Sequence, residues 1–467
     1  MTALLPRSSV LSTAPQHSLP PDRQLPDRPH LLLVASGSRA FREYLLRPLA
    51  EHYRVHLFTV AEAGWEVRYL DDWTVLSDLT DAGRLIAAAQ ALDIRDRIDG
   101  VLCWDEASVI AAARVAEALG LPGAGTAAVL RCQDKHQTRR LLAEAGVPQP
   151  DSVLVQTVDQ AVLAAAGLGY PVVLKPRDPV ASMGVVLVAS ERELREQFAL
   201  ATDSTVSGPG ISVLVEENAD GPEISVDCAV FHGEVLPICL AHRQIGYRPY
   251  FEEIGHLVDG ADPMLADPGF REILQQAHAA LGFTDGFSHT EFRLTPLGPK
   301  LIEINPRLGG DLIPYLGLRT TGVDPALAAA AVAVGRRPEI SAENKAFAAV
   351  RFCYVPHEMT IGAIGFDADR MPSGVDLAVT LAQPGERQAP PPTGSVTGRI
   401  ALVTAVGDSE ADVREVIAAA ESALRVTEAP AGTAPVLELP LSQPREADGR
   451  TARQVVRARP LPMTARA

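Results

Sequence analysis

The chain changes its pattern of strands and helices near residue 150, and this change limits the folds open to it. Before it, short apolar runs at residues 30–38, 53–60 and 99–104 alternate with helical patterns such as AGRLIAAAQALDIRDRI. Strands alternating with helices indicate βαβ units and a parallel sheet. After it, apolar runs come in pairs joined by turns, which is typical of antiparallel hairpins with helices on one face. We therefore expect an α/β first part followed by an α+β part.

Composition and hydrophobic pattern indicate where the regions of the chain begin and end. Residues 1–28 hold five prolines and little periodicity, which predicts a disordered leader. A Rossmann-like domain is expected over 29–130, and the hairpin region reaches about residue 340. A third region, 346–430, has strand-like runs and the amphipathic helix pattern SEADVREVIAAAESALRV. From Glu438 onward, the chain has six arginines and three acidic residues in a stretch that we interpret as a disordered tail.

Charge and cysteine content exclude several classes of protein. The chain of 467 residues has 58 acidic and 42 basic side chains, a formal charge of -16, which argues against nucleic-acid binding. Its five cysteines are scattered, so neither a disulfide framework nor a zinc site is expected. No apolar run reaches the length of a membrane span, and prolines interrupt the N-terminal stretch where a secretory signal would lie. We expect a cytoplasmic enzyme with small-molecule partners.

Two lysines and a loop suggest a phosphate site. Lys135 stands just ahead of an amphipathic helix, and Lys175 ends the apolar run VVLKP. A lysine at the end of a buried strand needs an anionic partner, which a phosphate could provide. The loop DPVASMG, with Ser182, Met183 and Gly184, could bring backbone N–H groups close to that phosphate. Taken singly, these features also suit a surface lysine, a lysine reaching solvent from a strand end, and an ordinary hairpin loop.

The segment VLVEENADGPEISV has carboxylates between two strands. Glu216 and Glu217 end the first strand, and Glu223 opens the second. Carboxylates at such a hinge can accept hydrogen bonds from adenine N6 or ribose hydroxyls, while the backbone beside Asn218 and Ala219 can read the adenine edge. An acidic surface turn is the alternative.

The hairpin HTEFRLTPLGPKLIEINPRLGG carries the most informative set. Residues i, i+2 and i+4 of a strand share a face, so Glu303, Asn305 and Arg307 point the same way, with Glu291 on the partner strand beside them. Two carboxylates and an amide oxygen form a hard oxygen cluster that suits Mg²⁺. Arg307 would provide a cation for a phosphoryl group. A surface ladder of salt bridges is the alternative.

Taken in order, these pieces resemble the ATP-grasp superfamily of carboxylate-amine and carboxylate-thiol ligases, from about His30 to Val426. Within it the chain is most similar to the L-amino acid ligases of the bacilysin-synthetase type. That group has a Glu-x-x-His pair on a loop facing the substrate, and Glu253 and His256 in YFEEIGHLVDG match it. One departure concerns the hinge, where the family often has a large apolar residue and this chain has Asn218.

The resemblance implies a three-part fold, with an ATP-grasp domain over 131–340, a lid over roughly 150–215 and a small C-terminal α+β domain over 346–430. It implies ATP and Mg²⁺, with Mn²⁺ as a substitute. The ligase would join a carboxylate, expected to be an amino acid, to an amine through an acyl phosphate, giving a dipeptide or amide plus ADP and phosphate. Lys135 and Lys175 would hold phosphates, Arg307 would stabilise developing charge, Glu253 would pair with an amino group, and His256 would orient or deprotonate the amine.

Two other functions stay open. A carboxylase of the biotin-carboxylase type shares the ATP site, although the chain has no Met-Lys-Met carrier motif. A non-catalytic ATP-binding protein is the second, and the full set of metal ligands argues against it. The sequence does not give the substrate pair, the pathway or the oligomeric state, for which a homodimer remains open.

Overall fold

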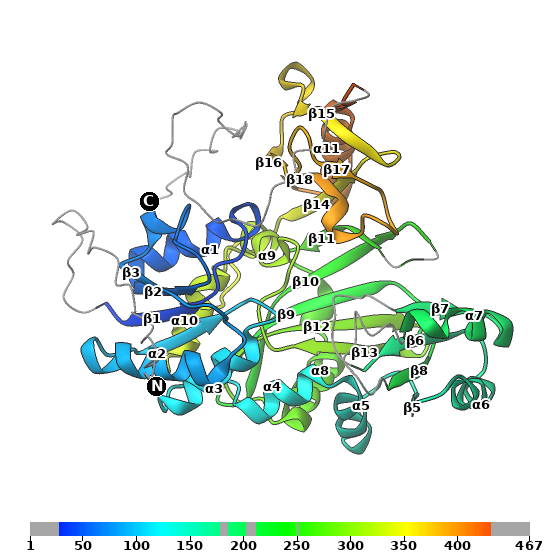
Figure 1. Ribbon diagram of the computed structural model, residues 1–467, viewed down its shortest axis with the longest axis horizontal. Coiled ribbons are helices and arrows are strands. Elements are labelled where there is room, and N and C mark those ends of the chain that lie inside the picture. Colours follow the sequence, from blue (N-terminus) through cyan, green and yellow to red (C-terminus); the bar gives the residue numbers. More distant parts are fainter. Residues whose placement is uncertain (1–27, 178–184, 202–211, 249, 251, 431–467) are drawn as a thin grey trace, which may run out of the picture.

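The computed structural model describes residues 28–177, 185–201, 212–248, 250 and 252–430 (Figure 1). Its first sheet has the order β3-β2-β1-β4 and is parallel throughout, as the strand and helix alternation predicts. The apolar run LLLV of β1 is completely buried because helices cover both faces of the sheet. The sequence patterns missed β3, an edge strand with the half-exposed sequence DWTV. The strands are β1 (His30–Val34), β2 (Arg54–Thr59), β3 (Asp72–Val75) and β4 (Gly100–Cys103).

Helices make up the rest of the first part and frame the later sheets. Asp134 caps α5, because its carboxylate accepts from the backbone N–H groups of His136 and Gln137, and this cap fixes Lys135 at the first helical position. The helices are α1 (Arg39–His52), α2 (Ala82–Arg95), α3 (Val109–Ala118), α4 (Thr126–Gln133), α5 (Lys135–Glu144), α6 (Val158–Leu168), α7 (Glu191–Ala201), α8 (Pro268–Leu281), α9 (Ile313–Thr321), α10 (Pro325–Ala333) and α11 (Glu410–Ala423).

A four-stranded antiparallel sheet, which we call the lid sheet, has the order β5-β8-β6-β7. It lies apart from the first sheet, at the right of Figure 1, together with α6 and α7. The predicted hairpin of PVVLKP and GVVLVAS forms β6 and β7, and the loop residues Ser182, Met183 and Gly184 lie outside the described residues. The strands are β5 (Ser152–Val155), β6 (Val172–Pro176), β7 (Val186–Val188) and β8 (Val213–Glu217).

The central sheet has eight strands in the order β13-β12-β9-β10-β11-β14-β18-β16, all antiparallel. The hairpins predicted around residues 232–233 and 296–297 are both present. At the first, His232 and Gly233 have φ values of 51° and 80°, as a two-residue turn between twisted strands requires. The strands are β9 (Glu223–Phe231), β10 (Glu234–Gly246), β11 (Glu252–Asp259), β12 (Gly286–Thr295) and β13 (Gly298–Asn305), followed by β14 (Phe347–Tyr354), β16 (Val375–Thr380) and β18 (Arg399–Gly407).

Both faces of the central sheet are covered by apolar packing. On one face, α9 and α10 lie between this sheet and the N-terminal sheet, so that Ala330 packs in one cluster with Leu31 and Val350. On the other face, α8 and α4 pack through Phe270 and Cys132 against β9 and β12. The cysteines of these clusters are buried and unpaired. This arrangement fixes the edge of the sheet from which the polar side chains of the hairpin at 286–305 emerge.

The C-terminal region adds to the central sheet. In the region predicted as a small C-terminal α+β domain, 346–430, the strands β14, β18 and β16 extend the central sheet through the pairing of β11 with β14. A further sheet has the order β17-β15-β19, formed by β15 (Met359–Phe366), β17 (Arg387–Gln388) and β19 (Leu424–Glu428). Hydrophobic patterns do not show which strand edges meet, so this pairing had no signal in the sequence. The mixed α/β and α+β class is confirmed, and the domain limits stay a prediction.

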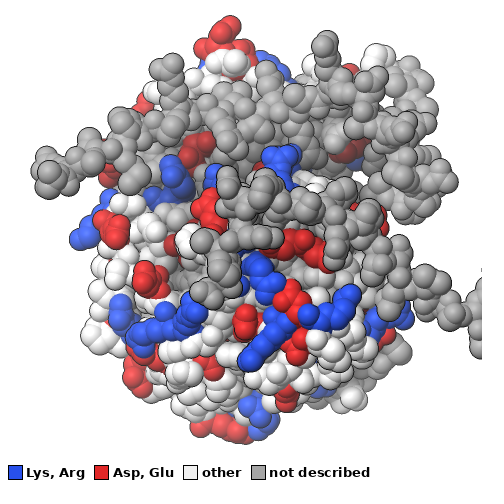
Figure 2. Space-filling view, turned by 90° about the vertical axis from the view of Figure 1, so that its left-hand side faces the viewer, with Lys and Arg blue, Asp and Glu red and all other residues white. Residues whose placement is uncertain are grey.

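The visible charges on the N-terminal side of the molecule are mixed. Figure 2 shows Lys and Arg side chains interspersed with Asp and Glu on this face. Pairs such as Arg54 with Asp96, at 2.6 Å, account for part of the pattern. None of the described helices has the length and apolar composition that a membrane crossing needs.

Candidate active site

One cleft of about 370 Å³ gathers nearly all the predicted site residues. It lies where the lid sheet, the central sheet and the segment before β18 meet. Of the predicted residues that the structure describes, His256 alone does not line it. The leader before residue 28 and the tail beyond residue 430 lie outside the described residues. The residues brought together from the prediction are Lys135, Lys175, Glu216, Glu217, Asn218, Ala219, Glu223, Glu253, Glu291, Glu303, Asn305 and Arg307.

Glu216 anchors a lysine at the lid side of the cleft. Its carboxylate is 1% exposed and lies 2.8 Å from Lys175 Nζ and 2.6 Å from Arg139 Nε. Burial opposes its ionisation, but the charges of Arg139 and Lys175 outweigh burial and lower the pKa of Glu216 to about 2. Both oxygens of Glu216 are engaged, so Glu216 is placed to orient Lys175, and a direct contact between Glu216 and a nucleotide stays a prediction. No sequence feature pointed to Arg139, which lies within an ordinary amphipathic helix pattern.

The hinge between the lid sheet and the central sheet is the segment from Glu217 to Glu223. Glu217 ends β8 and holds Lys300 of β13 at 2.6 Å, while Glu223 opens β9 and pairs with Arg293 of β12. The cleft reaches Asn218 and Ala219, which lie between them. A nucleotide base could therefore meet backbone here, between two carboxylates that are each held by a cation.

The predicted metal ligands face one another on the hairpin of β12 and β13. Glu291 lies directly opposite Glu303, and Asn305 lies opposite His289. Glu303 is 3.4 Å from Lys135 Nζ, and Asn305 is 8% exposed. Two carboxylates and an amide oxygen at the cleft wall fit the oxygen donors that Mg²⁺ prefers. These residues would hold the ion between the phosphate side and the substrate side of the cleft.

His289 supports Glu291 from behind. Its Nδ1 lies 2.7 Å from the buried carboxylate of Asp227, and its Nε2 lies 3.6 Å from Glu291. Burial alone would lower the pKa of His289, but the hydrogen bonds to Asp227 and Glu291 outweigh it and raise that pKa to about 9. The imidazolium therefore favours the ionised form of Glu291, whose pKa is lowered well below its usual range, although burial opposes this, by Arg243 and His289.

Arg243 is the residue at the centre of the cleft that sequence reasoning missed. Its guanidinium lies 2.9 Å from Glu291, 2.7 Å from Glu253 and 3.8 Å from Glu223. It comes from AHRQ, near the end of a strand whose half-polar pattern looked like part of a hairpin. A strand of alternating exposure does not show which of its polar residues meets a cleft. Arg243 links the expected metal ligands to the expected substrate carboxylate.

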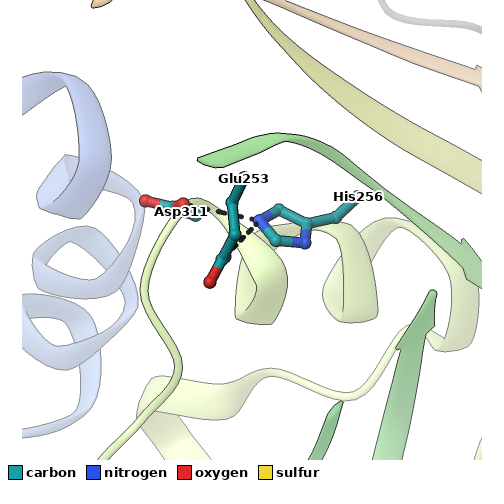
Figure 3. A group of neighbouring side chains, drawn as sticks. All are labelled: Glu253, His256 and Asp311. Atoms are coloured by element: carbon teal, nitrogen blue, oxygen red, sulfur yellow. Dashed lines mark hydrogen bonds and ion pairs between the residues drawn. The ribbon is translucent and has the colours of Figure 1, made fainter. Parts of the chain in front are cut away.

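Glu253 and His256 lie on β11 and not on a loop as predicted. Residues three apart on a regular strand face opposite sides, but the register between β10 and β11 shifts at Ile254. This extra residue restores a common side, so His256 Nε2 lies 3.5 Å from Glu253 and 3.4 Å from Asp311 (Figure 3). His256 is fully buried, and burial lowers its pKa. His256 therefore contacts Glu253 from within the protein and does not line the cleft.

Burial also changes the acidity of Glu253. Desolvation and the nearby acidic groups, above all Asp311, raise the pKa of Glu253 to about 7, against the opposing charge of Arg243. Asp311 was not predicted. It follows the Gly-Gly after Leu308 and is held by Arg399 through two contacts of 2.6 and 2.8 Å. The ligand atoms of Glu253, His256 and Asp311 all lie within 4.8 Å of one another. Two guanidinium groups already neutralise these carboxylates, so the geometry suits an internal charge network better than a metal ion.

Arg307 lies two residues beyond the end of β13, and not on the strand with Glu303 and Asn305 as predicted. It pairs with Glu106 of the N-terminal part and donates to the Leu308 carbonyl at 2.9 Å. Glu106 also accepts from Gln133, at 2.5 Å, and had no signal in the sequence beyond following a strand. The ion pair ties the first part of the chain to the cleft and leaves Arg307 in the cleft wall.

Family models match the chain in two places. The ATP-grasp domain matches residues 168–315 and the ATP-grasp N-terminal domain matches residues 57–123. The uncharacterized protein y4rH of Sinorhizobium fredii is 29% identical over 73% of this chain and 70% of its own length. Human carnosine synthase 1 is 30% identical over 54% of this chain, but the chain spans only 32% of that protein.

Solved structures show the same fold. The L-amino acid ligase of Bacillus licheniformis has a TM-score of 0.72 at 20% identity, covering 86% of this chain and 99% of that one. A biotin carboxylase of Campylobacter jejuni has a TM-score of 0.64 at 17% identity, covering 86% and 92%. At these identities the likeness concerns the fold. The chain therefore contains an ATP-grasp domain over residues 168–315 and an ATP-grasp N-terminal domain over residues 57–123, and it has the fold of the solved ATP-dependent ligase structures.

Proposed function

We propose that this protein is an ATP-dependent carboxylate-amine ligase that activates an amino acid as an acyl phosphate and joins it to an amine. The observation that carries the proposal is the order of charges along one cleft. Lys135 pairs with Glu303, Glu303 lies opposite Glu291, and Arg243 links Glu291 to Glu253. Lys175 and Arg307 line the same cleft and provide further cations. This arrangement suits an amino acid substrate whose carboxylate lies next to the ATP phosphates and whose ammonium group is held by Glu253.

The first step is phosphoryl transfer from ATP to the substrate carboxylate, with ADP as leaving group. Catalysis of this step rests on positioning and on neutralising charge. Lys175, oriented by Glu216, and Lys135 hold phosphate oxygens, and Arg307 neutralises charge on the transferring group. Mg²⁺ bound by Glu291, Glu303 and Asn305 would supply Lewis-acid neutralisation of the phosphate oxygens.

In the second step the amine attacks the acyl carbon and inorganic phosphate leaves, so an amide bond forms as the C–O bond to phosphate breaks. The amine must lose a proton. Glu253, whose pKa is about 7, can hold an ammonium when ionised and can accept a proton near neutral pH. His256, hidden behind Glu253, acts through it as a positioning residue.

Two comparisons support this reading over its alternatives. The fold matches an L-amino acid ligase over nearly its entire chain, and a protein named carnosine synthase 1 shares sequence over half of this chain. The biotin carboxylase has the same fold, so carboxylation remains the second candidate. Glu253, which lines the cleft, favours the ligase, because bicarbonate has no ammonium group for a carboxylate to hold.

The test is a screen of the full chain with ATP and Mg²⁺ against amino acids, singly and in pairs. We expect ADP, phosphate and an amide from particular pairs, little ADP from single substrates, and no stimulation by bicarbonate. Mass spectrometry identifies the product. A carboxylated or phosphorylated single substrate, with no amide from any pair, would reject the proposal and favour the carboxylase or a kinase.

A further inference from the structure

Glu252, next to Glu253 on β11, differs from the other carboxylates of the cleft. It is 6% exposed and lines the cleft. Its Oε1 accepts from Tyr354 Oη at 2.6 Å, and its Oε2 accepts from Ser395 Oγ at 2.5 Å. Both partners are neutral, and Glu252 forms no ion pair with any residue that the structure describes.

Every other acidic residue lining the cleft is paired with a lysine or arginine, within the described part of the chain. Glu253 and Glu291, for example, share Arg243, and Asp311 is held by Arg399. The further pairs are Glu106 with Arg307, Glu216 with Lys175, Glu217 with Lys300, Glu223 with Arg293, and Glu303 with Lys135. A buried carboxylate without a counter-ion costs free energy unless a cation compensates it. In this cleft, a bound substrate can bring that cation.

The hydroxyl groups around Glu252 are fixed so that it stays an acceptor. Arg399 Nε lies 3.2 Å from Tyr354 Oη and donates to it, so the tyrosine proton is free to go to Glu252. Arg399 is itself held by Asp311 and lies 3.8 Å over the ring of Phe352. Each oxygen of Glu252 accepts one bond in this network and has a further lone pair for a donor from the cleft.

The surroundings suit an aliphatic chain that ends in a positive charge. Val396, next to Ser395 in the chain, lines the cleft, and Tyr354 behind Glu252 packs edge-on against Tyr247, with ring centroids 5.4 Å apart. Apolar surface beside a carboxylate accommodates the methylene stem and the ammonium head of an aminoalkyl group together. Ser395 and Val396 lie before β18 and Tyr354 ends β14, so the C-terminal region builds this wall.

We propose that Glu252, presented by Ser395 and Tyr354, determines specificity and selects an amino acid with a cationic aminoalkyl side chain as the carboxylate substrate. This inference rests on the ligase function proposed above. Glu253 holds the α-ammonium group and its chain neighbour Glu252 holds the side-chain ammonium, so the substrate brings two positive charges to two carboxylates.

The test compares lysine with norleucine, which has a similar side-chain length but no ammonium, as carboxylate substrates of the full chain with one fixed amine. We expect the wild type to prefer lysine in kcat/KM by at least about tenfold, the size of one specific polar contact. Glu252→Gln keeps the shape of the side chain but removes its charge and replaces one acceptor oxygen with an NH₂ donor, so one of the two hydroxyl groups has to accept instead of donate. The variant should reduce the preference for lysine over norleucine about tenfold. Glu358→Gln, at an exposed carboxylate of the same region, should leave the preference unchanged.

Equal use of lysine and norleucine by the wild type, or an unchanged preference in Glu252→Gln, would overturn the inference. Calorimetric binding of lysine and norleucine to the wild-type protein with ADP and Mg²⁺ checks it without any variant or turnover. Tighter binding of lysine supports the assignment, and equal binding refutes it. If amides form without a preference for lysine, the ligase function holds and the role of Glu252 is rejected. If no pair gives an amide, the ligase function is rejected, and the calorimetric comparison of lysine with norleucine decides whether the cleft binds a side-chain ammonium group.

Discussion

At the residue scale, several charged side chains of the cleft each form ion pairs with more than one partner. Arg243 serves three carboxylates, and Glu216 serves Arg139 and Lys175. A shared counter-ion holds several charged side chains in place at once. Removing one member of such a group leaves another buried charge uncompensated. The effects of single substitutions here should therefore be larger than those of surface ion pairs.

Glu303→Gln should abolish Mg²⁺-dependent ADP formation while the protein stays folded. Glu303 faces Glu291 across the hairpin, and the amide keeps its shape but loses the charge that the ion needs. Steady-state assays over a range of Mg²⁺ concentrations, with thermal unfolding as the check on folding, measure the effect. Turnover close to that of wild type would contradict the metal assignment.

Glu216→Gln should lower the free energy of unfolding by about 3–5 kcal/mol, the usual cost of breaking a buried ion pair. The pKa of Glu216 is lowered from 4.5 to about 2 in the folded protein, so its stabilisation is complete above about pH 4.5 and is lost as the pH falls toward 2. The difference in Tm between wild type and variant should shrink over that range in calorimetry. A difference that does not depend on pH would show that the charge of Glu216 is not the cause.

At the scale of elements, irregular points place the functional side chains. The register shift at Ile254 puts Glu253 and His256 on one side of β11. The hinge after β8 transfers the chain from the lid sheet to the central sheet within five residues, 218–222. The sequence shows little hydrophobic periodicity at such points, because their residues set the path of the chain and the direction of side chains and do not pack in the core.

Gly221→Ala should destabilise the hinge. Gly221 has a φ of +154°, and a Cβ there would lie 2.0 Å from the Leu294 carbonyl oxygen of β12. The hinge and β12 would therefore have to move apart. We expect a loss of about 1–3 kcal/mol and weaker ATP binding. Gly298→Ala is the matched control, since its φ of +110° is also positive but a Cβ there meets nothing within 4 Å. Equal losses in the two variants would mean that backbone strain, and not the contact with β12, sets the cost.

At the scale of the whole molecule, the central sheet joins the ATP-grasp region and the C-terminal region into one structure. β11 pairs with β10 on one edge and β14 on the other. Leu257 of β11 packs in one core with Val403 and Val413. The same C-terminal elements bring Ser395 and Arg399 to the cleft. Fold and site therefore depend on the same strand pairing.

A chain ending at residue 340 should fail to fold, because it exposes the edge of β11 and the apolar side chains that β14 and β18 cover. A chain ending at residue 430 keeps all the described strands and is the matched control, for which we expect wild-type ATP binding. Solubility, thermal unfolding and nucleotide binding compare the two. A folded, ATP-binding protein of 340 residues would show that the C-terminal strands are dispensable.

The sequence by itself predicted many of the strands and helices and the order of the motifs, although it missed the edge strand β3. Hydrophobic periodicity depends on local spacing, so the buried β1, the hairpin turn at Gly233 and the shared strand of Glu303 and Asn305 could be predicted directly, whereas Arg307 lies beyond the end of that strand. The shared face of Glu303 and Asn305 with Glu291 followed from strand geometry alone.

Only the tertiary structure decided which of these residues meet. Arg243, Asp311 and Glu252 are separated in sequence from their partners, and nothing local distinguishes them from other polar residues on strands and loops. The joining of β14 to β11 is of the same kind, since edge pairing depends on which edges remain free after the hairpins form. Long-range pairing of charges and of strand edges is fixed by packing, because the free energy of a buried charge depends on its surroundings and not on its position in the chain.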